Sequence, residues 1–212
     1  MRLLLVISLS FCSLFTWAQK AEQQLGINLF GAFGFLDNVA ETPMSRSLDL
    51  RYQYHLDSQT FMEFSSGYEV LNRLNNRDIS KYRSAGGFFR ASINLVNRSN
   101  WFYGGIGMHL AVQNQNYTVE IGGDRFPAFT RKFENKNVPV SLFASMGIKA
   151  LIRPKLTLAC NFELYRSMVT RDEKTERIYH VAGTGAGLNP NHNGALLSSK
   201  INLFLFYRLF PE

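Results

Sequence analysis

Beyond its first residues, the sequence lacks any long uninterrupted apolar stretch. No run after residue 18 approaches the roughly 18 consecutive apolar residues that a transmembrane helix requires, although 46% of the 212 residues are hydrophobic. Inside a bilayer every backbone polar group needs an internal partner, so only a helix or a closed β-barrel can span it. The composition therefore excludes a helical membrane domain and leaves a soluble fold or a β-barrel.

Cysteine and histidine are also scarce. There are two cysteines, Cys12 and Cys160, and Cys12 lies in the N-terminal segment, so we expect no disulfide within the rest of the chain. The four histidines do not form a closely spaced zinc-binding pair: they are His55, His109, His180 and His192. We therefore expect neither a metal site nor a cofactor.

The first 18 residues are organised like a secretory signal. Arg2 supplies the positive start, residues 3–15 form a mostly apolar core, and Thr16-Trp17-Ala18 fits a small-residue cleavage site. We predict a signal peptide at 1–18 and a single domain at 19–212, because the remaining length suits one domain. Export argues against a nucleic-acid partner, and we interpret the net charge of +7 as scattered loop charge.

Eight segments of the predicted domain alternate apolar and polar residues with period two, which indicates β-strands. The clearest sets Leu48, Leu50 and Tyr52 against Asp49 and Arg51. The eight predicted strands are residues 25–35, 48–56, 61–71, 82–96, 101–113, 138–152, 156–165 and 195–210. Both faces of the last segment carry aromatic residues, so the alternation does not determine which of its faces points inward.

The connections between these segments alternate in length. Three are short, at residues 57–60, 97–100 and 153–155, and four are long, at 36–47, 72–81, 114–137 and 166–194. Short periplasmic turns and long extracellular loops are typical of outer-membrane barrels. We predict an all-β fold: an eight-stranded antiparallel up-and-down transmembrane β-barrel with both termini on the periplasmic side. A soluble barrel, apolar inside and polar outside, is the alternative.

An eight-stranded barrel is just wide enough for side chains to fill its interior. Closely packed charges there should pair, because an unpaired buried charge is costly. We predict a polar plug that holds the barrel shut; a gated ion path through Glu63, Arg90 and Glu163 is the alternative. The predicted interior network comprises Asp49, Arg51, Glu63, Glu69, Arg90, His109, Lys149, Glu163 and Arg208.

The C-terminal segment carries a family resemblance. Leu203, Leu205, Tyr207 and Leu209 alternate up to the aromatic Phe210, and together they form a predicted assembly signal. With the signal at 1–18 and the alternating loops, residues 25–210 resemble small eight-stranded outer-membrane barrels of the outer-membrane protein A transmembrane-domain and outer-membrane protein X type. The resemblance implies a Gram-negative outer membrane, contact with outer-membrane lipid and lipopolysaccharide, and insertion by the barrel-assembly machinery.

The resemblance does not define a task, because this scaffold carries several functions. We expect a non-enzymatic structural, adhesin-like or binding role through the loops, with an extracellular or envelope protein as a possible partner. One alternative is a lipid A-modifying hydrolase, for which His192, Ser198 and Glu173 are the best candidates. Another is a narrow channel or an envelope-assembly subunit. We interpret the glycine-rich run 183–187 as a flexible loop rather than a phosphate site.

Overall fold

The fold is seen in a computed structural model that describes residues 22–30, 46–72, 79–123, 126–168, 181–184, 186–187 and 195–209. These residues are almost entirely β-strand, and none of them belongs to a helix long and apolar enough to cross a membrane. The strands are β1 (Gln23–Asn28), β2 (Arg46–His55), β3 (Thr60–Leu71), β4 (Ile79–Val96), β5 (Phe102–Gly123), β6 (Phe126–Asn137), β7 (Val140–Arg153), β8 (Leu156–Met168), β9 (Ala186–Gly187) and β10 (Ala195–Arg208).

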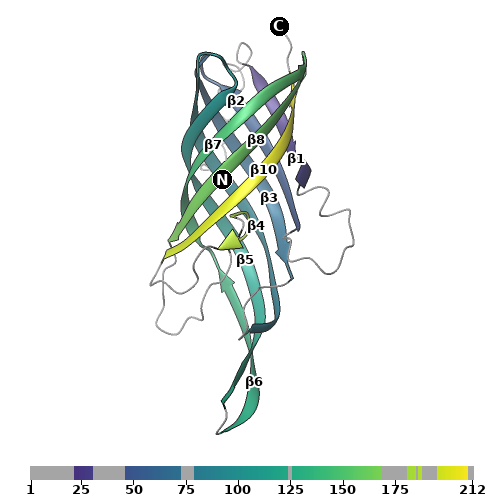
Figure 1. Ribbon diagram of the computed structural model, residues 1–212, viewed down its shortest axis with the longest axis vertical. Coiled ribbons are helices and arrows are strands. Elements are labelled where there is room, and N and C mark those ends of the chain that lie inside the picture. The colour runs from purple at the N-terminus through teal and green to yellow at the C-terminus, as the bar shows by residue number, and fades with distance from the viewer. Residues whose placement is uncertain are drawn as a thin grey trace, which may run out of the picture.

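Eight of these strands close into an antiparallel barrel (Figure 1). Each wall strand pairs with the next in the order β1, β2, β3, β4, β5, β7, β8 and β10, and β1 returns to pair with β10 from Gln24↔Arg208 to Asn28↔Phe204. Closure removes the exposed strand edges that an open sheet would present. The predicted eight-stranded up-and-down barrel is confirmed.

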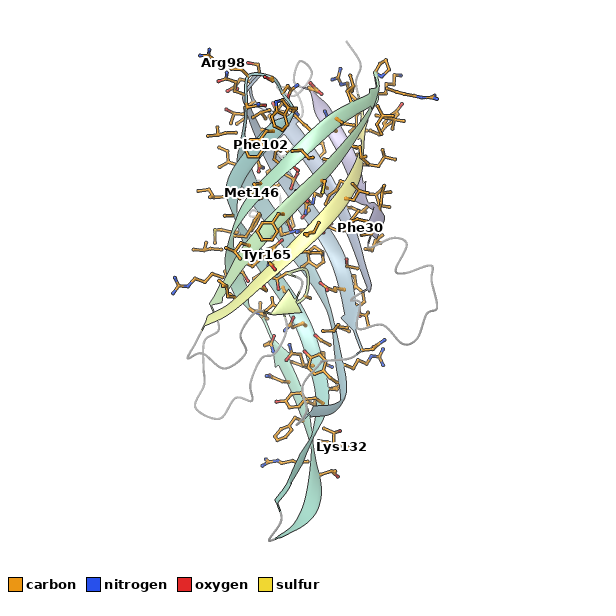
Figure 2. All side chains as sticks on the ribbon, viewed as in Figure 1. Phe30, Arg98, Phe102, Lys132, Met146 and Tyr165 are labelled. Carbon is orange, nitrogen blue, oxygen red and sulfur yellow. The ribbon has the colours of Figure 1, made fainter. Side chains whose placement is uncertain are left out.

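The polarity of the barrel is inverted relative to a soluble protein. Large apolar side chains lie on the outer surface: Ile106 is 67% exposed, Met108 58% and Met146 54%, and Figure 2 shows Phe102 and Met146 pointing outward. The inward positions carry polar and charged side chains instead, among them Asp49, which is fully buried. An apolar outer band around a polar interior is the arrangement of a transmembrane barrel, not of a soluble one.

The short connections lie together at one end of the barrel, which we call the turn end. The turn between β4 and β5 is held by Asn97, whose side-chain oxygen accepts hydrogen bonds from the backbone N–H groups of Trp101 (3.1 Å) and Phe102 (3.0 Å). Asn100 has a φ of 56° there, a left-handed conformation that asparagine tolerates better than most residues. Trp101 and Phe102 are exposed beside this turn, as expected of an interfacial aromatic belt.

The opposite end, which we call the loop end, differs from the expected strand bounds. The first strand stops at Asn28, not at residue 35, and the described residues 29–30 leave the ladder. The fifth strand continues to Gly123, ten residues past its expected end, because β6 pairs with it from Asn137 to Phe126. β7 then takes the place of β6 beside β5, with the Ala111 N–H bonded to the Pro139 carbonyl at 3.1 Å.

Aromatic side chains fill the barrel near the turn end. Phe61 packs edge-on against Tyr103 with ring centroids 5.7 Å apart, and Phe204 lies beside Phe206 at 5.7 Å. All four residues are at most 3% exposed. This settles the open question of the last strand: Phe204 and Phe206 face inward, while Tyr207 faces outward. Gly147 leaves room for this packing, since a Cβ there would lie 2.6 Å from Tyr103 Cζ.

Candidate functional site

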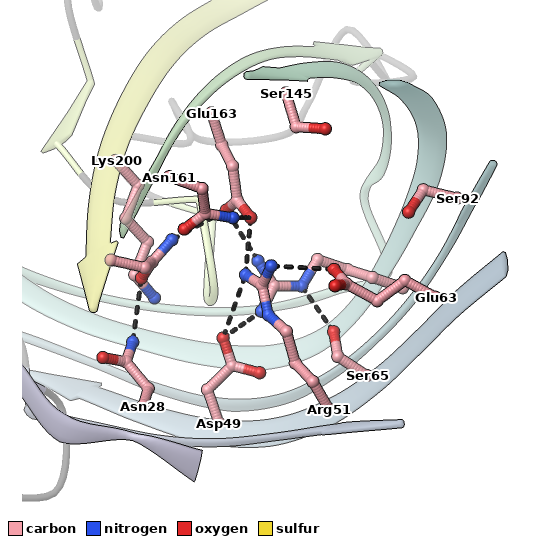
Figure 3. A network of polar contacts seen from close by, with 12 residues as sticks. Asn28, Asp49, Arg51, Glu63, Ser65, Ser92, Ser145, Asn161, Glu163 and Lys200 are labelled. Atoms are coloured by element: carbon pink, nitrogen blue, oxygen red, sulfur yellow. Dashed lines mark hydrogen bonds and ion pairs between the residues drawn. The ribbon is translucent and has the colours of Figure 1, made fainter. Parts of the chain in front are cut away.

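An ion-pair network crosses the middle of the lumen (Figure 3). Alternation along β2, β3, β4 and β8 points its five charged members inward, and all are at most 8% exposed: Asp49, Arg51, Glu63, Arg90 and Glu163. Four of them come from the consecutive, neighbouring strands β2, β3 and β4, and Glu163 reaches them from β8 across the narrow barrel. We call these five residues the central network.

Glu163 is the acceptor at the centre of this network. Its Oε1 accepts from Arg51 Nη2 at 2.5 Å and from Asn161 Nδ2 at 2.9 Å. Its Oε2 accepts from Arg90 Nη1 at 2.8 Å, from the Tyr165 hydroxyl at 2.5 Å and from Asn202 Nδ2 at 3.0 Å. One buried carboxylate therefore receives five hydrogen bonds, two of them from arginines.

The two arginines tie the other carboxylates to this centre. Arg51 also donates from Nη1 to Glu63 Oε1 at 2.7 Å, and its guanidinium carbon lies 3.8 Å from the centroid of the Phe204 ring. Arg90 pairs with Asp49 and donates from Nε to the Ser65 hydroxyl at 2.7 Å. The network thus links β2, β3, β4 and β8 across the lumen.

The central network is enclosed on both sides. Phe61, Tyr103 and Phe204 fill the lumen toward the turn end. Toward the loop end, Phe88 and Ala111 form a small apolar cluster that includes residues of a segment between β8 and β10. Buried charges without partners would be costly, and here each charged side chain has an ionic partner. This arrangement is suited to bracing a closed barrel.

Of the remaining four predicted interior residues, three lie inside the barrel but outside the central network, and the fourth, Arg208, lies partly exposed at the rim. Glu69 accepts a hydrogen bond from the Gly183 N–H, and His109 packs edge-on against the Tyr165 ring at 5.6 Å. Lys149 lies toward the turn end with its Nζ 5.5 Å from the Phe61 centroid. Arg208 pairs with Glu22 at 2.8 Å at the rim.

Five polar side chains that bond to the central network were missing from the predicted set: Gln53, Ser65, Asn161, Tyr165 and Asn202. Tyr165 is the most informative, because its hydroxyl accepts from Arg90 Nη1 at 2.6 Å while donating to Glu163. Its inward position follows from alternation, since it lies two residues beyond Glu163 on the same strand. Residue type alone gave no sign of it, because tyrosines also form the outer aromatic belts.

Of the candidate hydrolase residues, Ser198 is the one that lies within the described part of the chain. Ser198 is fully buried and faces the lumen, opposite Tyr165 on the neighbouring strand. A lipid A hydrolase would need its nucleophile on the lipid-facing side, so the placement of Ser198 does not match that role. His192 and Glu173 lie outside the described residues.

The predicted assembly residues occupy the seam where the barrel closes. Leu203 and Leu205 are half-buried on the outer face, and Tyr207 and Leu209 are 47% and 37% exposed. Tyr207 pairs with Leu25 of the first strand. Phe210 lies outside the described residues.

A second candidate site is the sheet that projects past the barrel at the loop end, which we call the β4–β5–β6 extension (bottom of Figure 1). β5 pairs with β4 out to Ile79↔Val119 and with β6 out to Gly123↔Phe126. Tyr117 packs between Tyr82, at a centroid distance of 6.3 Å, and Phe133, at 5.1 Å. Its exposed charged residues on β6 are Arg131, Lys132, Glu134 and Lys136.

No family model matches the sequence, and no curated protein matches it. Among solved structures, the attachment invasion locus protein Ail of Yersinia pestis has a TM-score of 0.45 at 10% identity, covering 89% of this chain and 97% of that chain. Neisserial surface protein A (NspA) has a TM-score of 0.41 at 10% identity, covering 89% and 94%. Ail in complex with the heparin analogue sucrose octasulfate has a TM-score of 0.41 at 9% identity, covering 90% and 100%. Likenesses this remote carry no inference about a ligand.

Proposed function

We propose that this chain is a non-enzymatic outer-membrane protein that binds an extracellular partner through its β4–β5–β6 extension. The observation that carries the proposal is the continuation of three paired strands well past the closed barrel. A projecting sheet holds its surface residues in fixed positions, whereas an unpaired loop would have to lose conformational entropy on binding. The extension therefore offers a preorganised binding surface on a membrane anchor.

The enclosed lumen favours this role over transport. The central network spans the barrel between two apolar layers, and its arginines are held by carboxylates on several strands. Passage of an ion would require breaking buried ion pairs, at a cost of about 3–5 kcal/mol for each partner removed. We therefore propose a closed barrel whose activity lies outside the membrane.

The location follows from the same proposal. Residues 1–18 would direct export and 19–212 would insert with the help of the barrel-assembly machinery, so that the apolar outer face meets lipid and the rim meets lipopolysaccharide. The turn end would face the periplasm and the extension the exterior. In intact cells, added trypsin should then cleave after Arg131 or Lys132 in the extension and should spare Arg98 in a turn-end loop. Cleavage after Arg98 alone would show that the protein has the opposite orientation in the membrane.

The binding role is tested by removing the extension. In Gram-negative cells that display the protein, residues 117–133 are replaced by a two-residue Asn-Gly turn, which suits a tight hairpin. Retention of these cells on immobilised matrix proteins and glycans should fall to the level of cells without the protein. Heat-modifiable mobility in gels should persist, because the central network is untouched. Arg98→Ala is the matched change at the opposite end and should leave retention intact; retention that survives removal of the extension would contradict the proposal.

The hydrolase alternative is tested in the same cells. Mass spectrometry of their lipid A should show an unchanged acyl composition, because Ser198 faces the lumen. Loss of an acyl chain that depends on His192 would overturn the non-enzymatic role.

A further inference from the structure

Part of the chain between β8 and β10 re-enters the barrel at the loop end. Val181, Ala182 and Thr184 are at most 1% exposed, and Gly183 is also buried. We call residues 181–184 the inserted segment. β9 follows it and pairs with Ser198 and Ser199 of β10. The glycine-rich run was interpreted as a flexible loop, but Gly183 and Thr184 instead lie packed inside the lumen.

The inserted segment is bound much as a peptide ligand would be bound. Two successive backbone N–H groups donate to side chains of the wall: Ala182 to Gln113 Oε1 at 2.7 Å, and Gly183 to the Glu69 carboxylate. Beneath them, Val181 and Ala182 pack against Phe88 and Ala111. The wall thus provides two polar acceptors above an apolar floor, a combination typical of small binding sites.

The third residue of the inserted segment, Gly183, must be glycine. Gly183 has a φ of +85°, which side-chain-bearing residues rarely adopt. A Cβ at this position would also lie 2.6 Å from Phe88 Cγ and 2.9 Å from His109 Nε2, closer than real contacts permit. The site therefore distinguishes glycine from alanine by shape as well as by backbone conformation.

The segment is a self-contained turn, and the barrel closes without it. Thr184 donates to the Val181 carbonyl from its N–H at 3.1 Å and from its hydroxyl at 2.8 Å. Around it, β3, β4 and β5 pair continuously with one another, and none of the ion pairs of the central network includes a residue of the segment. Withdrawal of the segment would leave both the wall and the network complete.

We propose that the loop end of the lumen is a peptide-binding site that the chain fills with its own inserted segment. Glu69 and Gln113 recognise two successive backbone N–H groups, and Phe88 with Ala111 receives the small apolar side chains. The ligand class is a short turn-forming peptide in which the second of these two N–H groups belongs to a glycine. The inserted segment is then a tethered occupant that such a peptide can replace. This site is separate from the β4–β5–β6 extension and does not depend on its role.

The first test is designed to release the inserted segment without substituting any residue of the barrel wall. Gly183→Ala adds one methyl group inside the site, and Gly87→Ala is the matched control, because a Cβ there would meet no atom closer than 3.7 Å. Hydrogen exchange is measured on the purified full chain in lipid vesicles. In Gly183→Ala, the amides of 182 and 183 should exchange at least about tenfold faster, as expected for losing buried hydrogen bonds, while the β3, β4 and β5 ladder amides stay as in the control.

Glu69→Gln is a second, shape-conserving variant, with the exposed Glu134→Gln as its control. Removing the charge should speed exchange at the 183 amide by about five- to tenfold, because a hydrogen bond to a charged group is stronger than one to a neutral group. Acceleration of the ladder amides together with the segment in both variants would show that the segment is an integral part of the barrel core. Unchanged exchange at 182 and 183 in both variants would show that these contacts do not hold it. Either result overturns the proposal.

The ligand class is tested with peptides added to the Gly183→Ala protein. A capped Val-Ala-Gly-Thr peptide should give saturation-transfer NMR signals with this variant, and a capped Val-Ala-Ala-Thr peptide should not. The wild-type chain, whose site is filled, should give signals at least about tenfold weaker. Equal signals from the two peptides, or none from either, would overturn the assignment of a peptide site.

Discussion

Replacing Glu163 by glutamine tests whether the central network holds the barrel together. The substitution keeps the size and shape of the side chain, removes its negative charge and replaces one carboxylate oxygen by the –NH2 of an amide. In the unaltered protein, Glu163 Oε1 accepts from Arg51 and Asn161, while Oε2 accepts from Arg90, Tyr165 and Asn202. Whichever oxygen is replaced, an –NH2 group then faces at least one buried guanidinium that is itself a donor.

The size of the effect follows from that geometry. Removing one partner of a buried ion pair costs about 3–5 kcal/mol, because the remaining charge stays desolvated. The amide oxygen that remains still accepts from one arginine, and Arg51 and Arg90 retain Glu63 and Asp49 as partners. We therefore expect Glu163→Gln to lower the free energy of unfolding by about 3 kcal/mol, the lower end of that range.

The measurement is reversible urea unfolding of the purified protein from lipid vesicles, followed by intrinsic tryptophan fluorescence. The midpoint should fall while the slope with urea stays constant, because the surface exposed on unfolding is the same. Glu134→Gln, an identical exchange on the exposed face of β6, should change the free energy by less than about 0.5 kcal/mol. If Glu163→Gln were as mild as this control, the network would not be what braces the barrel.

Three further outcomes are expected. Tyr165→Phe removes a hydroxyl that bridges Arg90 and Glu163 and should lower the free energy of unfolding by about 1–3 kcal/mol in the same assay. Met108→Arg should cost about 2–4 kcal/mol in vesicles and Asn114→Arg about 0–1, because the first lies in the apolar outer band and the second near its boundary; equal costs would contradict the membrane position. The Gln59 N–H donates to the Asp57 carboxylate at 2.7 Å and lowers the pKa of that carboxyl. The stabilisation is present above the ordinary aspartate pKa and lost as pH falls through the lowered value. The protection of the Gln59 amide, taken relative to its intrinsic exchange rate at each pH, should therefore fall only below about pH 4, and this pH dependence should be absent in Asp57→Asn.

The sequence predicted the wall of the barrel because that information is local. Period-two alternation determines which side of a strand a residue occupies, so the inward positions of Asp49, Arg51 and Glu163 could be derived from neighbours along the chain. Their contacts could not, because Arg51 and Glu163 are 112 positions apart. Whether they meet depends on the stagger of all the strands between them, which no single segment encodes.

The inserted segment could not be predicted for a different reason. Residues 181–184 show no periodicity, and a glycine-rich run has the same composition in a solvent-exposed loop as in a buried turn. The length of the first strand was overestimated because a periodic pattern is present without a matching strand: Leu29 continues the apolar alternation, yet the strand ends at Asn28. Alternation indicates where a strand is possible, while pairing partners decide how far it extends.

The contacts of the central network predict which changes elsewhere in the molecule affect its contribution to stability. The central network and the inserted segment meet at Phe88: the Arg90 guanidinium carbon lies 5.0 Å from the centroid of its ring, and Val181 and Ala182 pack against the same side chain. Changes in the β4–β5–β6 extension should leave the stability supplied by Glu163 unaltered, since sites without shared partners contribute additively. A change at the inserted segment should instead couple to Glu163, because the segment and the network share Phe88 as a partner. Combining Glu163→Gln with Gly183→Ala tests this directly. We expect a coupling energy of about 0.5 kcal/mol or more, because the two sites share Phe88; a value within about 0.5 kcal/mol of zero would show that this contact does not couple them.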